Sequence, residues 1–193
     1  IMKYKFKTKP FDHQRKVLQE SWAQTHYAWF MEMGTGKSKV AIDNMACLYE
    51  AGQINAVLIV APKGVFDNWV QGEIPTHMPD RIPLEMLRWQ PNITKAFEDK
   101  LSILVLEPFA GIKMFVMNVE GFSTPKALRA ATLFLKHNPN NMLVIDESTT
   151  IKNRKAKRTA NILGLRSISK YRRILTGSPI TKSPMDLFSQ CEF

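Results

Sequence analysis

Short runs of apolar residues alternate along the chain with segments in which apolar positions recur at helical spacing. The apolar runs predict strands at 27–31, 56–61, 103–106, 114–119, 142–145 and 173–175. Helical spacing predicts helices at 37–50, 125–137 and 156–165. Strands that alternate with helices are typical of an α/β fold, here a mostly parallel, doubly wound central sheet with helices on both faces.

The domain organisation follows from what interrupts this pattern. No internal repeat, Gly/Ser linker or low-complexity tract occurs, and the prolines stand singly at predicted element boundaries such as Pro62, Pro125 and Pro179. We therefore predict one domain over 1–193. The region 72–109 is the least readable, because its apolar residues fit neither the helix nor the strand period well.

Composition narrows the class of protein. Apolar residues make up 45% of the 193 positions, which is enough to bury a core. The 27 Lys and Arg against 17 Asp and Glu give a net charge of +10, which favours a polyanionic partner such as nucleic acid. Cys47 and Cys191 lie far apart without metal-ligand spacing, so we expect reduced thiols. The apolar runs are much shorter than the roughly 20 residues of a membrane helix, which predicts a soluble protein with no membrane partner.

The segment 31–38, Met-Glu-Met-Gly-Thr-Gly-Lys-Ser, follows a predicted strand and opens a predicted helix, as a phosphate-binding loop requires. The backbone N–H groups of Gly34, Thr35 and Gly36 would bind phosphate oxygens. Lys37 would neutralise the β and γ phosphates, and the Ser38 hydroxyl would hold Mg²⁺. Met31 stands where the pattern has its first glycine, and a simple glycine turn that caps a helix is the alternative.

A second candidate element is the apolar strand 142–145, which ends in Asp146 and Glu147. Parallel strands deliver the residues at their carboxyl ends to the crevice where such sheets bind nucleotides. Asp146 would complete the Mg²⁺ shell, and Glu147 would orient and deprotonate the attacking water. Taken alone, two acids after a strand could equally form a helix N-cap, but their conjunction with the Gly-rich loop is specific. A GTPase is excluded because the chain has no Asn-Lys-x-Asp tetrapeptide.

Six segments in order resemble motifs of the superfamily 2 helicase ATPases, and within them of the Swi2/Snf2-like group with its phage members. The segment 10–14 resembles the Q motif, 31–38 motif I, 58–63 with Trp69 motif Ia, and 117–121 motif Ib. The segment 146–153 resembles motif II with its Lys-Asn tail, and 173–179 resembles motif III. The resemblance covers nearly the whole chain and implies a RecA-like P-loop domain that uses ATP and Mg²⁺.

The resemblance also implies roles for individual residues. Gln14 would read the adenine edge, since an amide offers both a donor and an acceptor; a polar position on an amphipathic helix is the alternative. Thr176 and Ser178 would couple the state of the γ-phosphate to DNA contact, whereas good turn chemistry alone would also explain them. Ser148 and Thr149 replace the Ala-His of the commonest motif II, which leaves Mg²⁺ binding intact and puts the histidine's coupling role in doubt.

Nucleic-acid contacts are expected at two places. Lys152, Arg154 and Lys155 open a run with five cations in seven residues, which would neutralise backbone phosphates or form a solvated charged face. Lys63 is the better single candidate, because the family places its DNA track at motif Ia. We expect Trp69 to pack a helix onto the sheet rather than to stack on a base.

The family builds its motor from two RecA-like lobes, and the chain ends at Phe193 shortly after motif III. We therefore expect the first lobe of a longer enzyme, whose second lobe supplies arginine fingers, with little hydrolysis by this lobe alone. The preferred hypothesis is an ATP-driven translocase or helicase on duplex DNA in the cytoplasm, that of an infected host cell if phage-encoded. The alternatives are a non-enzymatic P-loop module that binds DNA or protein, and an RNA-directed helicase.

Overall fold

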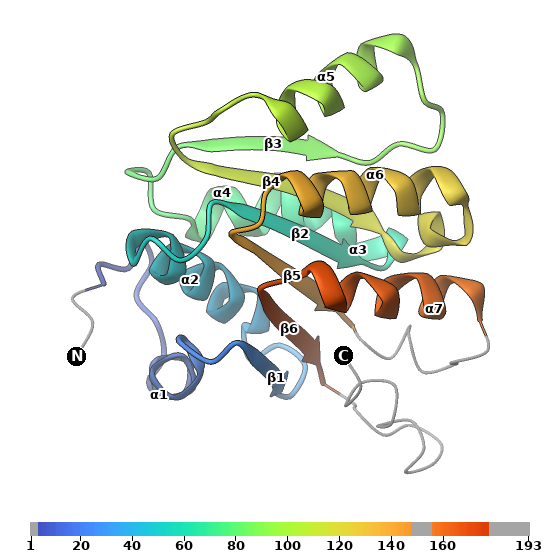
Figure 1. The fold of residues 1–193 in the computed structure, drawn as a ribbon. Helices are drawn as coiled ribbons and strands as arrows, with labels where there is room; N and C mark the ends of the chain where they lie inside the picture. The colour runs from blue at the N-terminus through green and yellow to red at the C-terminus, as the bar shows by residue number, and fades with distance from the viewer. Residues whose placement is uncertain (1–3, 148–155, 178–193) are drawn as a thin grey trace.

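The centre of the protein is a six-stranded sheet, seen in a computed structural model that describes residues 4–147 and 156–177 (Figure 1). The strand order is β1-β6-β5-β2-β4-β3, and every neighbouring pair among the described strands is parallel. The strands are β1 (His26–Phe30), β2 (Ala56–Ala61), β3 (Leu84–Arg88), β4 (Ile112–Asn118), β5 (Asn141–Asp146) and β6 (Tyr171–Thr176). The predicted α/β class with a mostly parallel sheet is confirmed.

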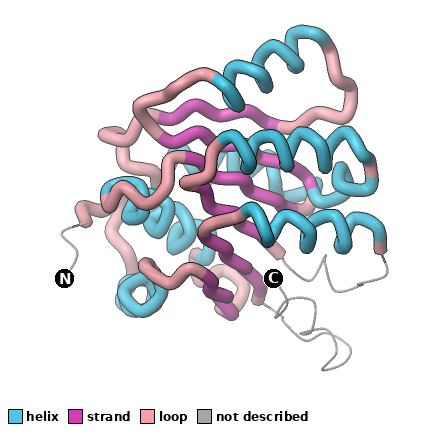
Figure 2. The backbone as a smooth tube through the Cα atoms, in the orientation of Figure 1, coloured by secondary structure: helices cyan, strands magenta, loops and turns pink. Residues whose placement is uncertain are grey.

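Helices cover both faces of this sheet, so that the molecule has three layers (Figure 2). One face carries α1 (Asp12–Ser21), α2 (Lys37–Glu50), α3 (Lys63–Asn68), the π-helical turn η1 (Trp69–Glu73) and α4 (Ile74–His77). The other carries α5 (Lys95–Leu106), α6 (Pro125–His137) and α7 (Lys157–Gly164), with the 3₁₀ turns η2 (Val119–Ser123) and η4 (Leu165–Ile168).

The central strand β2 shows why the sheet needs helices on both sides. All six of its residues are buried. Val57 and Ile59 point into one apolar core, whereas Leu58 and Val60 point into the other. A strand with two buried faces reads as a continuous apolar run, and this is the reason that its position could be predicted within the chain.

The region 72–109 holds the main correction to the predicted elements. The apolar run 103–106 is not a strand, because it forms the last turn of α5. That helix begins after Thr94, whose side-chain oxygen accepts a hydrogen bond from the Phe97 N–H at 3.3 Å. The strand of this region is instead β3, a half-buried edge strand that pairs only with β4 among the described strands. No helix in the described part of the chain is long and apolar enough to cross a membrane.

Candidate nucleotide-binding site

The Gly-rich loop joins the carboxyl end of β1 to the start of α2, as predicted. Gly34 and Gly36 have φ angles of 77° and 78°, a left-handed conformation that glycine adopts without steric cost. Between them, Thr35 folds back, with its hydroxyl donating to the Glu32 carbonyl at 2.7 Å. The loop therefore leads into the N-terminus of a 14-residue helix, where free N–H groups favour an anion.

Lys37 and Gln14 hold the loop from within. Lys37 is 8% exposed, and its ammonium donates to the carbonyls of Met31 and Glu32, each at 3.0 Å. The buried Gln14 amide donates from Nε2 to the Thr35 carbonyl at 2.9 Å, while its Oε1 accepts from the Phe11 N–H at 3.0 Å. The structure thus brings the Q-motif glutamine and the loop together. A role of Gln14 in reading adenine stays a prediction.

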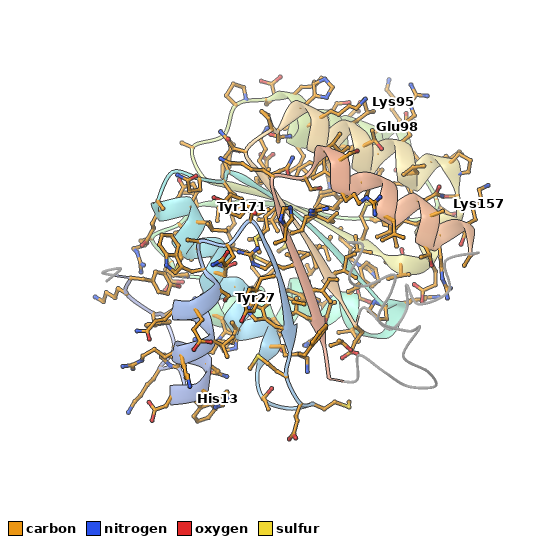
Figure 3. All side chains as sticks on the ribbon, turned by 60° about the horizontal axis from the view of Figure 1, so that its bottom comes forward. His13, Tyr27, Lys95, Glu98, Lys157 and Tyr171 are labelled. Atoms are coloured by element: carbon orange, nitrogen blue, oxygen red, sulfur yellow. The ribbon has the colours of Figure 1, made fainter. Side chains whose placement is uncertain are left out.

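His13 lies on the same side of α1 and was missed by sequence reasoning. It projects from the exposed surface of the helix (Figure 3), and its Nε2 lies 3.1 Å from the Thr35 carbonyl. Its ring also stacks on that of Phe11, with centroids 5.7 Å apart. Its position directly before Gln14 was the available signal, because consecutive residues at the start of one helix can both reach a loop beside it.

The end of β6 supports the loop from the other side. The Thr176 carbonyl accepts a hydrogen bond from the Met31 N–H at 3.2 Å. Gly177 lies so close that an added Cβ would stand 3.2 Å from the Met33 nitrogen and 3.4 Å from the Met31 oxygen. Thr176 and Gly177, the last two described residues of motif III, therefore lie against the Gly-rich loop. Ser178 lies outside the described residues, and the coupling role of Thr176 stays a prediction.

Asp146 and Glu147 follow at the carboxyl end of β5. Asp146 is 5% exposed, and both of its carboxylate oxygens accept hydrogen bonds. Oδ1 accepts from the Glu147 N–H at 2.9 Å and Oδ2 from the Trp69 indole Nε1–H at 2.7 Å. Glu147 has a φ of 48°, which is unusual for a residue with a side chain and is found at functional sites.

Several groups act on the pKa of Asp146. Burial raises the pKa of Asp146, the Trp69 hydrogen bond lowers it, and the neighbouring Glu147 charge raises it again. The positive charge of Lys37 also lowers the pKa of Asp146. The strand register places the Gly-rich loop and the two acids at one edge of the sheet, because Phe30 of β1 pairs with Thr176 of β6, and Asp146 of β5 pairs with Leu175 of β6.

The structure describes one of the four residues predicted to contact nucleic acid, Lys63. Lys63 is exposed and is the first residue of α3, directly beyond the carboxyl end of β2. Lys152, Arg154 and Lys155 lie outside the described residues. Trp69 is completely buried in the core between the sheet and α2, which confirms that it packs a helix onto the sheet. Sequence reasoning missed its bond to Asp146, because no local pattern links positions 77 residues apart.

The residues present fit a magnesium nucleotide. Two left-handed glycines and a helix N-terminus suit phosphate oxygens, and Ser38 stands in the first turn of α2. No group of three or more His, Cys, Asp or Glu side chains in 4–147 and 156–177 could hold a metal ion by itself. Mg²⁺ is usually held by one or two protein oxygens together with phosphate oxygens and waters, and Ser38 and Asp146 would supply two such oxygens.

These features define the class: a RecA-like α/β domain with a Gly-rich loop at the carboxyl edge of its sheet. The family follows from comparison with known proteins. The SNF2-related domain model matches residues 22–193, and the chain belongs to this family. The SWI2/SNF2 ATPase core of Sulfolobus solfataricus, solved in complex with double-stranded DNA, has the same fold, with a TM-score of 0.72 and 19% identity over 98% of this chain.

Curated relatives include the ATP-dependent helicase fft2 of Schizosaccharomyces pombe, 29% identical over 174 residues. The ATP-dependent helicase FUN30 of Saccharomyces cerevisiae is 26% identical over 162 residues. Each match covers 84% of this chain but only 12% and 13% of the two relatives. The chain covers 36% of the Sulfolobus chain. It therefore corresponds to a small part of these longer proteins.

Proposed function

We propose that this chain is the ATP-binding lobe of a DNA-dependent ATPase that couples ATP hydrolysis to movement on duplex DNA. One observation carries the proposal: Phe30, where the Gly-rich loop leaves β1, and Asp146, at the end of β5, pair with the adjacent residues Thr176 and Leu175 of β6, so the Gly-rich loop and the two acids lie at one edge of the sheet. Membership of the SNF2-related family supports ATP as the nucleotide. The relatives named above are ATP-dependent helicases, which supports hydrolysis in the full-length protein.

The roles follow from the chemistry of each group. Lys37 would neutralise phosphate charge, while the N–H groups of Gly34, Thr35 and Gly36 bind phosphate oxygens. Ser38 and Asp146 would hold Mg²⁺, which supplies charge stabilisation when bound. Glu147 is the acid with room to act, because it is half-exposed whereas Asp146 is buried. Its carboxylate would orient the attacking water and hold the proton that the water gives up.

DNA is the proposed polyanionic partner. The net charge of +10 supports it, as does the neighbouring ATPase core that was solved with double-stranded DNA. Lys63 would contact a backbone phosphate, and Lys152, Arg154 and Lys155 would extend the basic track. A second RecA-like lobe of the full-length chain would close over the nucleotide and supply arginine fingers, worth about 10³ to 10⁵ in turnover.

The test is the ATPase rate with and without duplex DNA, for the full-length protein and for this lobe. We expect DNA-stimulated turnover only in the full-length protein, and its loss in Glu147→Gln. Glu98→Gln is the matched control, because Glu98 is an exposed acid on α5, distant from His13 and the Gly-rich loop (Figure 3). Turnover that survives Glu147→Gln would contradict the assigned role of this acid.

The DNA contact has its own test. Lys63→Ala should weaken duplex binding at every sequence and reduce the slope of log affinity against log salt by about 1. Lys95→Ala removes an exposed lysine on α5 and should change neither quantity. Preference for RNA over duplex DNA would point to an RNA-directed helicase. DNA binding with a steep salt dependence but no hydrolysis in either protein would favour the non-enzymatic module.

The same proposal places the protein in the cytoplasm, that of the infected cell if a phage encodes it. The motif II variant Asp146-Glu147-Ser148-Thr149 supports a phage-type member through resemblance alone. Sequencing the gene and its neighbours tests this part, since phage structural or replication genes beside it are the expected result.

A further inference from the structure

Among the tryptophans in the described residues, only Trp69 donates a hydrogen bond to one of the two proposed site acids, Asp146. Its Nε1–H donates to Asp146 Oδ2 at 2.7 Å, and the Glu147 N–H donates to Asp146 Oδ1 at 2.9 Å. A carboxylate that accepts one directed bond on each oxygen cannot rotate about its terminal torsion without breaking one of them. The plane of the Asp146 carboxylate is therefore fixed by two neutral donors.

The chemistry of the indole suits this task. Trp offers one N–H donor and no acceptor, so it adds no charge to the site. An Arg or Lys at the same place would neutralise the carboxylate and compete with a cation for it. Each oxygen of Asp146 keeps a second lone pair. Its negative charge and two acceptor positions thus stay available to the shell of a divalent cation.

The backbone around Trp69 explains how the indole reaches Asp146. Trp69 begins the π-helical turn η1 directly after α3, and such turns are rare and concentrated at functional sites. An added Cβ on Gly72 would stand 2.5 Å from Asn68 Oδ1, so the turn brings these two residues closer than a side chain at 72 would allow. Phe66 and Ile74 are buried on either side of the turn. The ring of Trp69 is itself completely buried, so its direction is set by packing.

We propose that Trp69 is a positioning residue, which orients the Asp146 carboxylate for Mg²⁺ on the bound nucleotide. This inference rests on the proposed function, because it needs Asp146 to act on the cation. If Trp69 had only a structural role, its N–H would affect the stability of the protein and not the contribution of Mg²⁺ to nucleotide affinity. A positioning indole also sets how much Mg²⁺ adds to nucleotide affinity.

The experiment measures binding of a fluorescent ATP analogue to the full-length protein in Mg²⁺ and in EDTA. Trp69→Phe removes the N–H and keeps an aromatic ring. We expect it to lower the affinity in Mg²⁺ by about tenfold, as loss of a partner that orients a metal ligand does, and to leave the affinity in EDTA unchanged. Combined with Asp146→Asn, it should have no further effect, since its action passes through Asp146.

The chain offers a matched control. Trp29 is 1% exposed and lies in the same apolar core as Trp69, but its Nε1–H donates to the Ser21 hydroxyl at 3.0 Å and not to an acid. Trp29→Phe therefore makes the same chemical change in an equally buried place. It should lower stability without changing the Mg²⁺ increment. If Trp69→Phe folds poorly, a benzothiophene ring at position 69 keeps the shape of the indole and removes only its N–H.

The outcomes separate the two proposals. A wild-type protein without a Mg²⁺ increment, or an increment that survives Asp146→Asn, overturns the proposed function and this inference with it. A normal wild type and a defective Asp146→Asn, together with an unchanged increment in Trp69→Phe or the benzothiophene variant, overturn the role of Trp69 alone. A tenfold loss shared by Trp29→Phe would also overturn it, because the effect would then be one of general core damage.

Discussion

Gly36 is the position where the Gly-rich loop tolerates substitution least. Its φ of 78° costs a residue with a Cβ about 1 to 2 kcal/mol. An added Cβ would also stand 2.3 Å from Gln14 Nε2, and Gln14 is 3% exposed, so its amide has little space to move. If the amide rotates away, its 2.9 Å hydrogen bond to the Thr35 carbonyl is lost, at about 1 kcal/mol. Gly36→Ala should therefore destabilise the protein by about 2 to 3 kcal/mol.

Two other glycines separate the backbone strain from the clash. Gly34 and Gly52 have φ angles of 77° and 68°, and an added Cβ on either meets nothing within 4 Å. Gly34→Ala and Gly52→Ala should cost only the conformational part, about 1 to 2 kcal/mol. Urea unfolding at one temperature compares the three variants. Gly36→Ala should exceed the other two by about 1 kcal/mol, the value of the lost hydrogen bond.

A double-mutant cycle then tests the contact itself. Gln14→Ala removes the amide that blocks the Cβ, so the costs of Gly36→Ala and Gln14→Ala should not add, with a coupling of about 1 kcal/mol. Nucleotide affinity should fall in Gly34→Ala and Gly36→Ala but not in Gly52→Ala, which lies at the far end of α2. Additive costs, or equal stability of Gly36→Ala and Gly52→Ala, would refute the reasoning.

Three further variants test other parts of the structure. The buried Arg173 guanidinium donates to Asn44 Oδ1 at 2.9 Å and to the Gln24 carbonyl at 2.7 Å. Arg173→Met leaves the buried Asn44 oxygen unpaired and removes the bond to the Gln24 carbonyl, and it should cost about 3 kcal/mol in urea unfolding, whereas a loss below about 1 kcal/mol would contradict this account. Burial lowers the pKa of His77 below 6.5, so the unfolded chain binds the extra proton first and stability should fall as the pH drops through that value. His77→Gln should flatten this part of a stability profile. Thr94→Ala removes the N-cap of α5 and should cost about 1 kcal/mol, read from thermal unfolding.

The sequence was sufficient wherever structure is specified locally. Strand β2 has two buried faces and is therefore apolar throughout, and the Gly-rich loop carries its own turn residues. Strand β3 reads Leu-Glu-Met-Leu-Arg, which has good helix formers and no β-branched residue. It is a strand because β4 pairs with it, so the deciding interaction lies outside the segment. The strand predicted at 103–106 was wrong because a short apolar run fits either a strand or a helix. Here the run is the end of a helix that begins after its N-cap, Thr94.

The candidate site divides in the same way. Lys37, Asp146 and Glu147 were predicted from local motifs, and their roles stay predictions; their shared edge of the sheet followed from the rule for parallel strands. The left-handed backbone of Glu147 and the bond from Trp69 to Asp146 could not be predicted. Both depend on tertiary contacts between segments that are far apart in the chain, and a single sequence contains no signal for such contacts.

The hydrogen bonds of Lys37 bear on the proposed phosphate binding, because they would let this loop be ordered and still attract phosphate. Its ammonium bonds to the Met31 and Glu32 carbonyls, and no ion pair of Lys37 occurs among the described residues. Neutral acceptors orient the side chain without cancelling its charge, whereas a carboxylate partner would have to be displaced by an incoming phosphate. The loop is also held by Gln14 on one side and by the Thr176 carbonyl on the other. Most of the cost of ordering the loop is therefore met in folding, so that the proposed phosphate binding would use a site whose shape and positive charge already exist.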